Sequence, residues 1–269
     1  MAQNTELKEN YSKLVEAKLR AESIFAGLFN GRHEGDATAG AVKIPVRAEV
    51  TVGDYDIANG GDLTAPTTSY ETLVIDKDKY VNELIDGFVA EAVPDNIVAD
   101  RLDSAGYSLA DEVDVALITL AVEQGTTFTA SKKADTVYGT ITEAIQAAKK
   151  GKVKPNEMWL AVSNDYALEV INDPNFIAAS NLGDAIKQNG LLGRINGVAV
   201  YESANVPAGT DFVLGNRVYC HYVPAWAVPV GVKDLADGKH IGACAVQGRQ
   251  VYGAKVTKPA TVLVKKTTA

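Results

Sequence analysis

The chain has 269 residues, with 26 basic and 34 acidic side chains, a formal net charge of -8 and 46% hydrophobic residues. This length and composition are typical of a folded protein with one large or two medium domains, and they exclude wholesale disorder. The acidic excess argues against a general nucleic-acid binder. The only two cysteines, Cys220 and Cys244, exclude a disulfide scaffold and indicate a reducing compartment.

The sequence contains no evident secretory or membrane signal. Residues 1–10 are polar and carry Glu6, Lys8 and Glu9 where a signal peptide would be apolar. The most apolar run, Val113–Val122, is shorter than the ~20 residues of a membrane span, and Asp114 interrupts it. The sequence therefore predicts a soluble intracellular product with no membrane partner.

Residues 5–29 are expected to form an amphipathic helix. Apolar side chains recur at helical spacing, with Glu and Lys between them, at Leu7, Tyr11, Leu14, Val15 and Leu19. Asn30 and Gly31 end the pattern, and further glycines make the next ten residues loose. A helix on such a tether needs a partner surface, either in the same chain or on another subunit.

A long β-hairpin is expected next. Residues Lys43–Val52 alternate apolar and polar side chains, and Thr67–Ile75 is rich in threonine, tyrosine and β-branched residues. The 14-residue tip between them, Gly53–Pro66, contains the candidate contact residues Asp54, Tyr55, Asp56 and Leu63. Connections this long are uncommon in compact domains, and a two-stranded arm is marginal alone, so the hairpin is expected to lie on a neighbour.

The strongest helix signal runs from Ser108 to Gln124. Ser108 and Asp111 form a capping-box-like start, and a glycine follows the last helical residue. Apolar side chains cover more than one side of this helix, which suits a spine that crosses a domain. The preceding stretch, Asp76–Asp103, is expected to form short helices broken at Pro94.

Beyond residue 136 the pattern alternates between helix and strand and then becomes β. Thr140 and Glu143 form a capping box, which predicts a helix that ends at Lys150. The other expected elements are a helix at Asp165–Ile171, and strands at Met158–Val162, Gly197–Tyr201, Gln250–Val256 and Ala260–Lys265, with strand character from Thr210 onward.

Charge is unevenly distributed along the chain. Residues 71–124 contain 13 acidic and 3 basic side chains, whereas residues 231–269 contain 7 basic and 2 acidic ones. Two solvated faces would account for this distribution. The alternative is that the acidic segment of one copy faces the basic segment of another, which would favour ordered self-association.

The sequence offers few groups for catalysis. Its only histidines are His33, His221 and His240, and it has neither a nucleophile elbow nor a phosphate-binding glycine loop. Cys220 and His221 are adjacent on an expected strand, so their side chains point to opposite faces and do not suit one metal ion. Residues 190–193, Gly-Leu-Leu-Gly, match the nucleic-acid clamp of KH modules only superficially, and a plain turn is favoured there.

Four stretches stand out by their order along the chain. They are I-D-K-D-K-Y (75–80) leading to A-G-Y-S-L-A-D-E-V-D (105–114), P-N-E-M-W-L-A-V-S (155–163) followed by D-P-N-F (173–176), N-G-L-L-G-R-I-N-G-V-A-V-Y-E-S (189–203), and V-T-K-P-A-T-V-L-V-K (256–265). Together with the arm, hairpin, spine helix, α/β insert and returning strands, they make the sequence similar to the tailed-phage major capsid proteins of the Hong Kong 97 fold. The resemblance covers most of the chain from about residue 40 onward.

The resemblance implies an α+β fold with an N-terminal arm (1–39), an E-loop hairpin (40–75), a peripheral domain with the spine helix (76–136 and 206–269) and an axial domain (137–205). It implies a non-enzymatic subunit, without catalytic, cofactor or metal sites, that self-assembles as hexamers and pentamers. The resulting icosahedral shell would enclose the genome of a double-stranded DNA bacteriophage. The expected subunit-interface residues are Leu7, Tyr11, Leu14, Leu19, Asp54, Tyr55, Asp56, Leu63, Asn189 and Arg194.

The resemblance also implies partners and a location. The chain has no long N-terminal region of the kind that some members carry and remove, so a separate scaffolding protein is expected, besides a portal and decoration proteins. Packaged DNA is expected to touch the acidic subunit only weakly and without sequence preference. Assembly would take place in the bacterial host cytoplasm, and the product would be the virion capsid.

Two other functions stay open at this point. An encapsulin-like cellular compartment would use the same fold but would enclose a cargo enzyme instead of DNA. A small α/β enzyme that uses His221 or His240 would instead be a monomer or small oligomer with a concave polar pocket.

Overall fold

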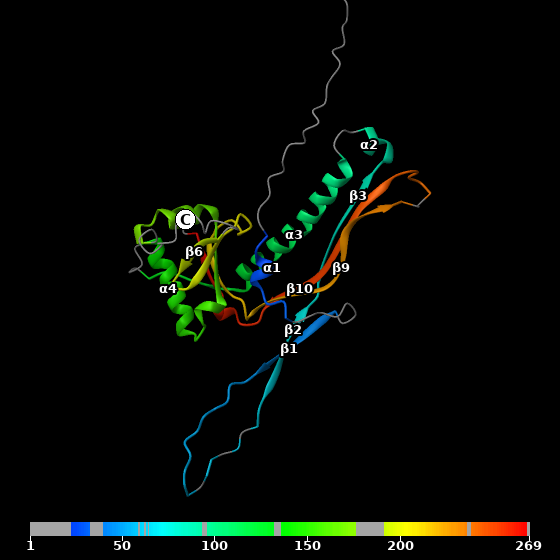
Figure 1. The fold of residues 1–269 in the computed structure, drawn as a ribbon. Helices are drawn as coiled ribbons and strands as arrows, with labels where there is room; N and C mark the ends of the chain where they lie inside the picture. The colour runs from blue at the N-terminus through cyan, green and yellow to red at the C-terminus, as the bar shows by residue number, and fades with distance from the viewer. Residues whose placement is uncertain are drawn as a thin grey trace, which may run out of the picture. The chain divides into compact units, whose positions relative to one another are not determined.

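The computed structural model describes residues 23–32, 40–58, 60, 61, 63, 65–92, 96–131, 136–175, 191–235 and 238–267. The chain divides into two compact units. The described part of the first unit lies within Tyr80–Leu109 and Val228–Arg249, and the second unit comprises Ala21–Lys79, Ala110–Ala227 and Gln250–Ala269. Several long elements run from one unit into the other, and Figure 1 shows the ribbon.

A six-stranded mixed sheet forms the centre of the second unit. Its strands, in spatial order, are β4 (Thr126–Thr127), β11 (Leu263–Lys266), β8 (Thr210–Asn216), β5 (Met158–Val162), β7 (Val198–Glu202) and β6 (Leu191–Ile195). β5 is parallel to β7 and antiparallel to β8, and every residue of β5 is buried. A strand covered on both faces needs this continuous apolar sequence.

Helices cover the two faces of this sheet with different sets of side chains. On one face, Leu160 and Val162 of β5 pack with apolar residues of α4 (Val137–Lys150) and α5 (Asn164–Asn172). On the other face, Trp159 and Ala161 pack with α1 (Phe25–Leu28) and with the later part of α3 (Ile97–Gln124). The alternation of side chains along β5 thus separates two hydrophobic clusters.

A buried carboxylate joins α1 to α3. Asp114, on α3, accepts hydrogen bonds from the backbone N–H groups of Phe25 at 2.7 Å and Ile24 at 3.2 Å, and from the Ser23 hydroxyl at 3.0 Å. These donors are the otherwise unpaired groups at the start of α1, so Asp114 caps a helix about 90 residues earlier in the chain. Burial raises the pKa of Asp114, and the hydrogen bonds from Ile24 and Phe25 oppose that rise.

The first unit contains the outer part of a three-stranded sheet and the start of α3. The strands lie in the order β3 (Lys77–Ile85), β10 (Cys244–Val256) and β9 (Cys220–Asp234). Ile85 and Val246 of this sheet are buried with Ala105 of α3, and the short helix α2 (Gly87–Ala92) follows β3. The Arg101 guanidinium donates to Glu83 at 2.8 Å, which adds a partly exposed ion pair to the apolar packing.

Much of the expected secondary structure is confirmed. The hairpin forms as β1 (Ala41–Arg47) and β2 (Thr68–Val74), and the expected strand at 158–162 and helix near 165–171 are present. Gly125 follows the last residue of α3, as expected. The predicted helix at 5–29 falls mostly outside the described residues, of which only its end, α1, is seen.

Two predicted helix starts were wrong. α3 begins at Ile97, so Ser108 lies inside the helix and caps nothing. Ile97, Val98 and Leu102 pack against the sheet of the first unit, and this tertiary contact extends the helix beyond its local signal. α4 begins after Thr136, whose hydroxyl accepts from the Gly139 N–H at 3.0 Å, and not at Thr140.

Two other segments were assigned to the wrong structure. Residues 77–85 form β3 and not a short helix, because they pair with β10, far away in the sequence. Residues 191–195 form the strand β6 and not a turn, since they pair with β7 across a register shift near Gly193. In the described ranges, no helix combines the length and apolar composition that a membrane-spanning segment needs.

The cap provided by Asp114 should contribute strongly to stability. Asp114→Ala leaves the donors at the start of α1 without an acceptor, so we expect the free energy of unfolding to fall by about 3 kcal/mol. Urea unfolding of the unassembled subunit measures this change. The control Glu123→Gln removes an exposed carboxylate from the same helix and should change stability by less than about 0.5 kcal/mol. Equal changes in the two variants would contradict the role of Asp114.

Candidate functional site

The described residues bring no catalytic group of side chains together. His221 is buried on β9 with its Nε2 atom 3.3 Å from the Thr257 hydroxyl, whereas His240 is exposed in the first unit. Burial raises the pKa of Cys220 to about 12, so its thiol stays protonated at neutral pH. Within the described ranges, no three His, Cys, Asp or Glu side chains are grouped as metal ligands. His33 lies outside those ranges.

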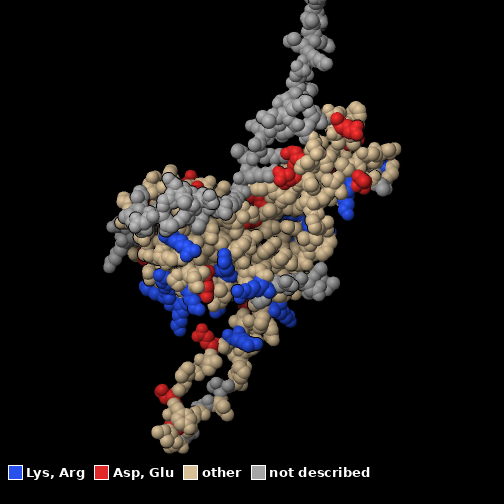
Figure 2. Space-filling view, in the orientation of Figure 1, with Lys and Arg blue, Asp and Glu red and all other residues tan. Residues whose placement is uncertain are grey.

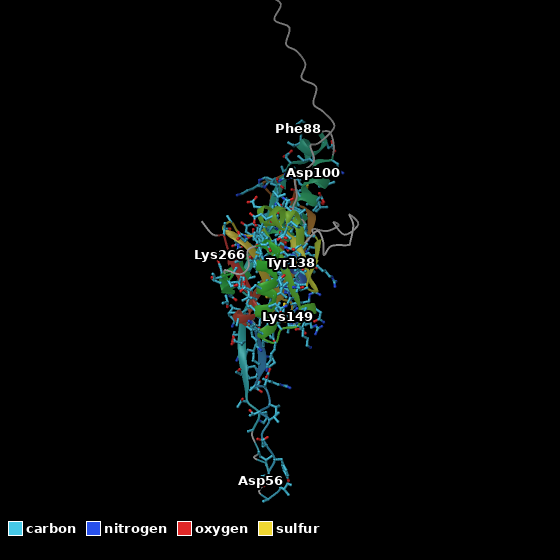
Figure 3. All side chains as sticks on the ribbon, turned by 90° about the vertical axis from the view of Figure 1, so that its left-hand side faces the viewer. Asp56, Phe88, Asp100, Tyr138, Lys149 and Lys266 are labelled. Carbon is cyan, nitrogen blue, oxygen red and sulfur yellow. The ribbon has the colours of Figure 1, made fainter. Side chains whose placement is uncertain are left out.

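The hairpin is the most prominent surface feature of the second unit. β1 and β2 pair from Ala41 opposite Val74 to Arg47 opposite Thr68, and one more backbone hydrogen bond links Ala48 to Thr67. Beyond this point the two chain segments continue outward without regular pairing, and Asp56 lies at the outer end (Figures 1 and 3).

The base of the hairpin is firmly attached to the second unit. Ile44 and Leu73 are buried together with Val223 of β9. The Lys255 ammonium donates to the Glu71 carboxylate at 2.7 Å and to the Thr72 carbonyl at 2.9 Å. β10 approaches so closely at Gly253 that an added Cβ would lie 2.4 Å from the Val74 carbonyl oxygen. The base of the hairpin is therefore held by its own apolar and ionic contacts, and the tip is not needed to attach the hairpin to the second unit.

The outer part of the hairpin exposes large apolar side chains. Five of them are at least 76% exposed: Val50, Val52, Tyr55, Ile57 and Leu63. The tip nevertheless has local order, because the Asp56 carboxylate accepts from the Ala58 N–H at 2.7 Å, and Gly60 N–H donates to the Asp56 carbonyl at 2.8 Å. Exposed apolar side chains gathered on one ordered segment are typical of contact sites for another molecule.

Charge changes sign along the hairpin. Lys43 and Arg47 lie on β1 near the base, whereas the outer part carries Glu49, Asp54 and Asp56. Figure 2 shows acidic side chains toward the outer end and basic ones toward the base. A partner surface for the tip would thus combine apolar side chains with positive charge.

The structure places only part of the expected interface. Asp54, Tyr55, Asp56 and Leu63 lie together on the exposed tip, whereas Arg194 is exposed on the edge strand β6. The remaining expected residues fall outside the described ranges: Leu7, Tyr11, Leu14, Leu19 and Asn189.

Sequence reasoning missed other exposed residues of the same surface. Val50 and Val52 were expected to form the buried apolar face of a strand, but β1 ends at Arg47 and both valines are exposed. The signal that could have identified them is the long connection Gly53–Pro66 that follows directly, because connections of this length are uncommon inside compact domains. Arg217 was also missed as a candidate site residue. It lines a pocket with Arg194, and no local sequence motif indicates this role.

The sequence also matches a model of a known protein family. The model described as phage capsid protein matches residues 87–264, which is about two thirds of the chain. No curated protein matches the sequence.

Solved structures from phages share this fold. A structure from Mycobacterium phage Che8 is 24% identical with a TM-score of 0.78, and the match covers 98% of each chain. The capsid structure of the cyanophage P-SCSP1u is 11% identical with a TM-score of 0.78, and the match covers 99% of this chain and 96% of that one. The mature capsid of bacteriophage PhiM1 is 15% identical with a TM-score of 0.71, over 97% and 92% of the two chains.

These findings confirm the expected capsid fold of the Hong Kong 97 type. The family match identifies the chain as a structural protein, not an enzyme, that assembles into capsid shells and is located in the virion capsid. The chain belongs to the phage capsid protein family, as a major capsid protein of a tailed phage.

Proposed function

We propose that copies of this chain form hexamers and pentamers of an icosahedral shell around double-stranded DNA, and that the hairpin tip joins neighbouring subunits. The observation that carries this proposal is the ordered, exposed apolar tip on a hairpin with an anchored base. Burying one large apolar side chain contributes roughly 1.5–3 kcal/mol, so five such residues can outweigh the ordering cost of the contact.

The parts of the subunit would then have distinct tasks in the shell. Residues 1–39 would be the arm, 40–75 the E-loop, and 76–136 with 206–269 the peripheral domain. Residues 137–205 would be the axial domain, whose loops meet at capsomer axes. The stripe of Leu7, Tyr11, Leu14 and Leu19 would lie against the shell, or against a scaffolding protein during assembly.

The proposed partners follow from the same role. A separate scaffolding protein, a portal and decoration proteins would act with the subunit in the host cytoplasm. The net charge of -8 supports only weak, sequence-independent contact with packaged DNA. Tight binding of the isolated subunit to duplex DNA at physiological salt would contradict this part of the proposal.

Removing the tip should separate folding from assembly. When a two-residue turn replaces Gly53–Pro66, the buried contacts of Ile44 and Leu73 remain, so we expect a folded subunit that does not close into shells. Circular dichroism measures folding, and electron microscopy with size-exclusion chromatography measures shells.

A point variant tests the same contact with less disruption. Ile57→Ser combined with Leu63→Ser removes two exposed apolar groups of the tip and should reduce shell yield severely. The control Val115→Ser removes a partly exposed apolar side chain from α3 and should leave the yield unchanged. Normal shells from the tip variant would argue against the proposed role of the hairpin.

The shell should be held together without covalent links between subunits. Some capsids of this fold join an E-loop lysine to a neighbour's asparagine, with a glutamate as base. Here Gly53–Ile75 contains no lysine, and Ala245–Tyr252 contains no glutamate, so two of the three reacting groups are missing from these segments. Lys255, at the hairpin base, is already paired with Glu71.

This expectation is checked by electrophoresis. Mature particles boiled in denaturant should run as a single band of 28.5 kDa. A ladder of heavier species that survives reductant would disprove it.

A further inference from the structure

One end of the six-stranded sheet carries a basic pocket. It has a volume of about 220 Å³ and is lined by Arg194 of β6, Arg217 after β8, and Glu157 and Trp159 around the start of β5. Because β5 and β7 are parallel, this pocket lies at the amino ends of both strands. We call it the basic pocket.

The two arginines of the basic pocket form no ion pair within the described chain. Neither Arg194 nor Arg217 forms an ion pair with another described residue. Trp159 is only 2% exposed, and its buried indole N–H has no acceptor among the described residues. Glu157 is held by Lys154 at 3.8 Å. Two exposed guanidinium groups without an ion-pair partner are donors suited to a carboxylate.

The opposite end of the same sheet carries an acidic pocket. It has a volume of about 450 Å³ and is lined by Asp165 and Glu169 of α5, by Thr210 and Asp211 of β8, and by residues that follow β5 and β7. It therefore lies at the carboxyl ends of the two parallel strands. The five residues of β5 separate the two ends by about 16 Å.

The acidic pocket keeps an excess of negative charge. Lys265 pairs with Asp211, and Thr267 donates to the same carboxylate at 2.6 Å, but Asp165 and Glu169 are exposed and form no ion pair with a described residue. Burial raises the pKa of Tyr166, and the negative charges of Asp211 and Glu169 raise it further. Thr210 is 2% exposed, and its hydroxyl has no partner in the described ranges.

We infer that these two pockets form a head-to-tail contact between copies of the chain, in which Asp165 and Glu169 of one copy meet Arg194 and Arg217 of the next. The inference rests on the proposed assembly function and names a contact within its rings. Opposite charges at opposite ends of one sheet favour such a heterologous contact, which closes into a ring when the rotation between copies allows it. A two-fold contact would instead place like charges together at either end.

The binding partner is a second copy and not a nucleic acid. A phosphate backbone would satisfy the basic pocket but would leave the acidic pocket without a function and facing a polyanion. Only a partner that carries both charges at the matching places satisfies the two ends together, and each copy of this chain does so.

Charge reversal at each end, alone and together, tests the contact. Arg194→Glu with Arg217→Glu makes both ends acidic, and Asp165→Lys with Glu169→Lys makes both ends basic. We expect either double variant to lower the yield of rings and shells about tenfold or more. The quadruple variant restores opposite charges with inverted polarity and should regain most of the yield. The control Lys150→Glu changes an exposed charge that lines neither pocket and should assemble normally.

Folding and assembly are measured separately for every variant, by circular dichroism and by electron microscopy. If a reversed variant fails to fold, Arg194→Gln with Arg217→Gln and Asp165→Asn with Glu169→Asn replace it, and each should again lower the yield.

Normal assembly of either folded double variant, or a folded quadruple variant that regains nothing, would overturn the inference. Basic-pocket variants that form normal shells but lose binding of short duplex DNA would assign the pocket to phosphate and would also overturn it. These outcomes overturn only the contact between the two pockets, and the proposed function still holds as long as the wild-type chain forms shells. If the wild-type chain forms no shells, the proposed function itself is contradicted.

Discussion

The second unit depends on the hydrogen bonds that the buried carboxylate of Asp114 accepts from the start of α1. Because Asp114 lies on α3, these bonds place Phe25 and Phe29 beside the sheet, where both rings lie 5.9 Å from the Trp159 ring. Trp159 in turn lies against Gly215 of β8, where an added Cβ would come within 2.1 Å of the indole. The helix, the N-terminal segment and the sheet are therefore joined at one buried point. Burying a carboxylate is costly, and only its full set of donors makes it tolerable here.

This internal cohesion explains why the hairpin tip can serve another task. The base of the hairpin is stabilised by Ile44, Leu73 and the ion pair between Lys255 and Glu71, all within the second unit. The tip contributes nothing visible to that core, yet it keeps an ordered turn and large exposed apolar groups. A fold that is complete without its tip can use the tip for assembly. The six-stranded sheet can likewise carry opposite charges at its two ends without weakening its core. The exposed charged side chains of the basic and acidic pockets stay in contact with solvent, so their charges are not buried.

Local sequence patterns were sufficient wherever neighbours in the chain decide the structure. The continuous apolar run at 158–162 indicated a buried strand, and the helical pattern at Asp165–Ile171 indicated α5. The hairpin, the end of α3 at Gly125 and the terminal strand β11 also follow from local alternation and turn residues. For the candidate site, the length and composition of Gly53–Pro66 were enough to indicate an exposed tip and to exclude a lysine from it.

Tertiary structure alone decided the rest, because the deciding contacts join residues far apart in the chain. Residues 77–85 have a pattern compatible with a helix and become a strand only by pairing with β10. α3 starts at Ile97 because its first turns pack on that sheet. The sequence by itself determined the capsid type of the fold, the main strands and helices of its core, and the exposed hairpin. The cap at Asp114 and the placement of Arg194 and Arg217 in one pocket had no local signal, since a carboxylate or a guanidinium gains its role only when the folded chain supplies its neighbours.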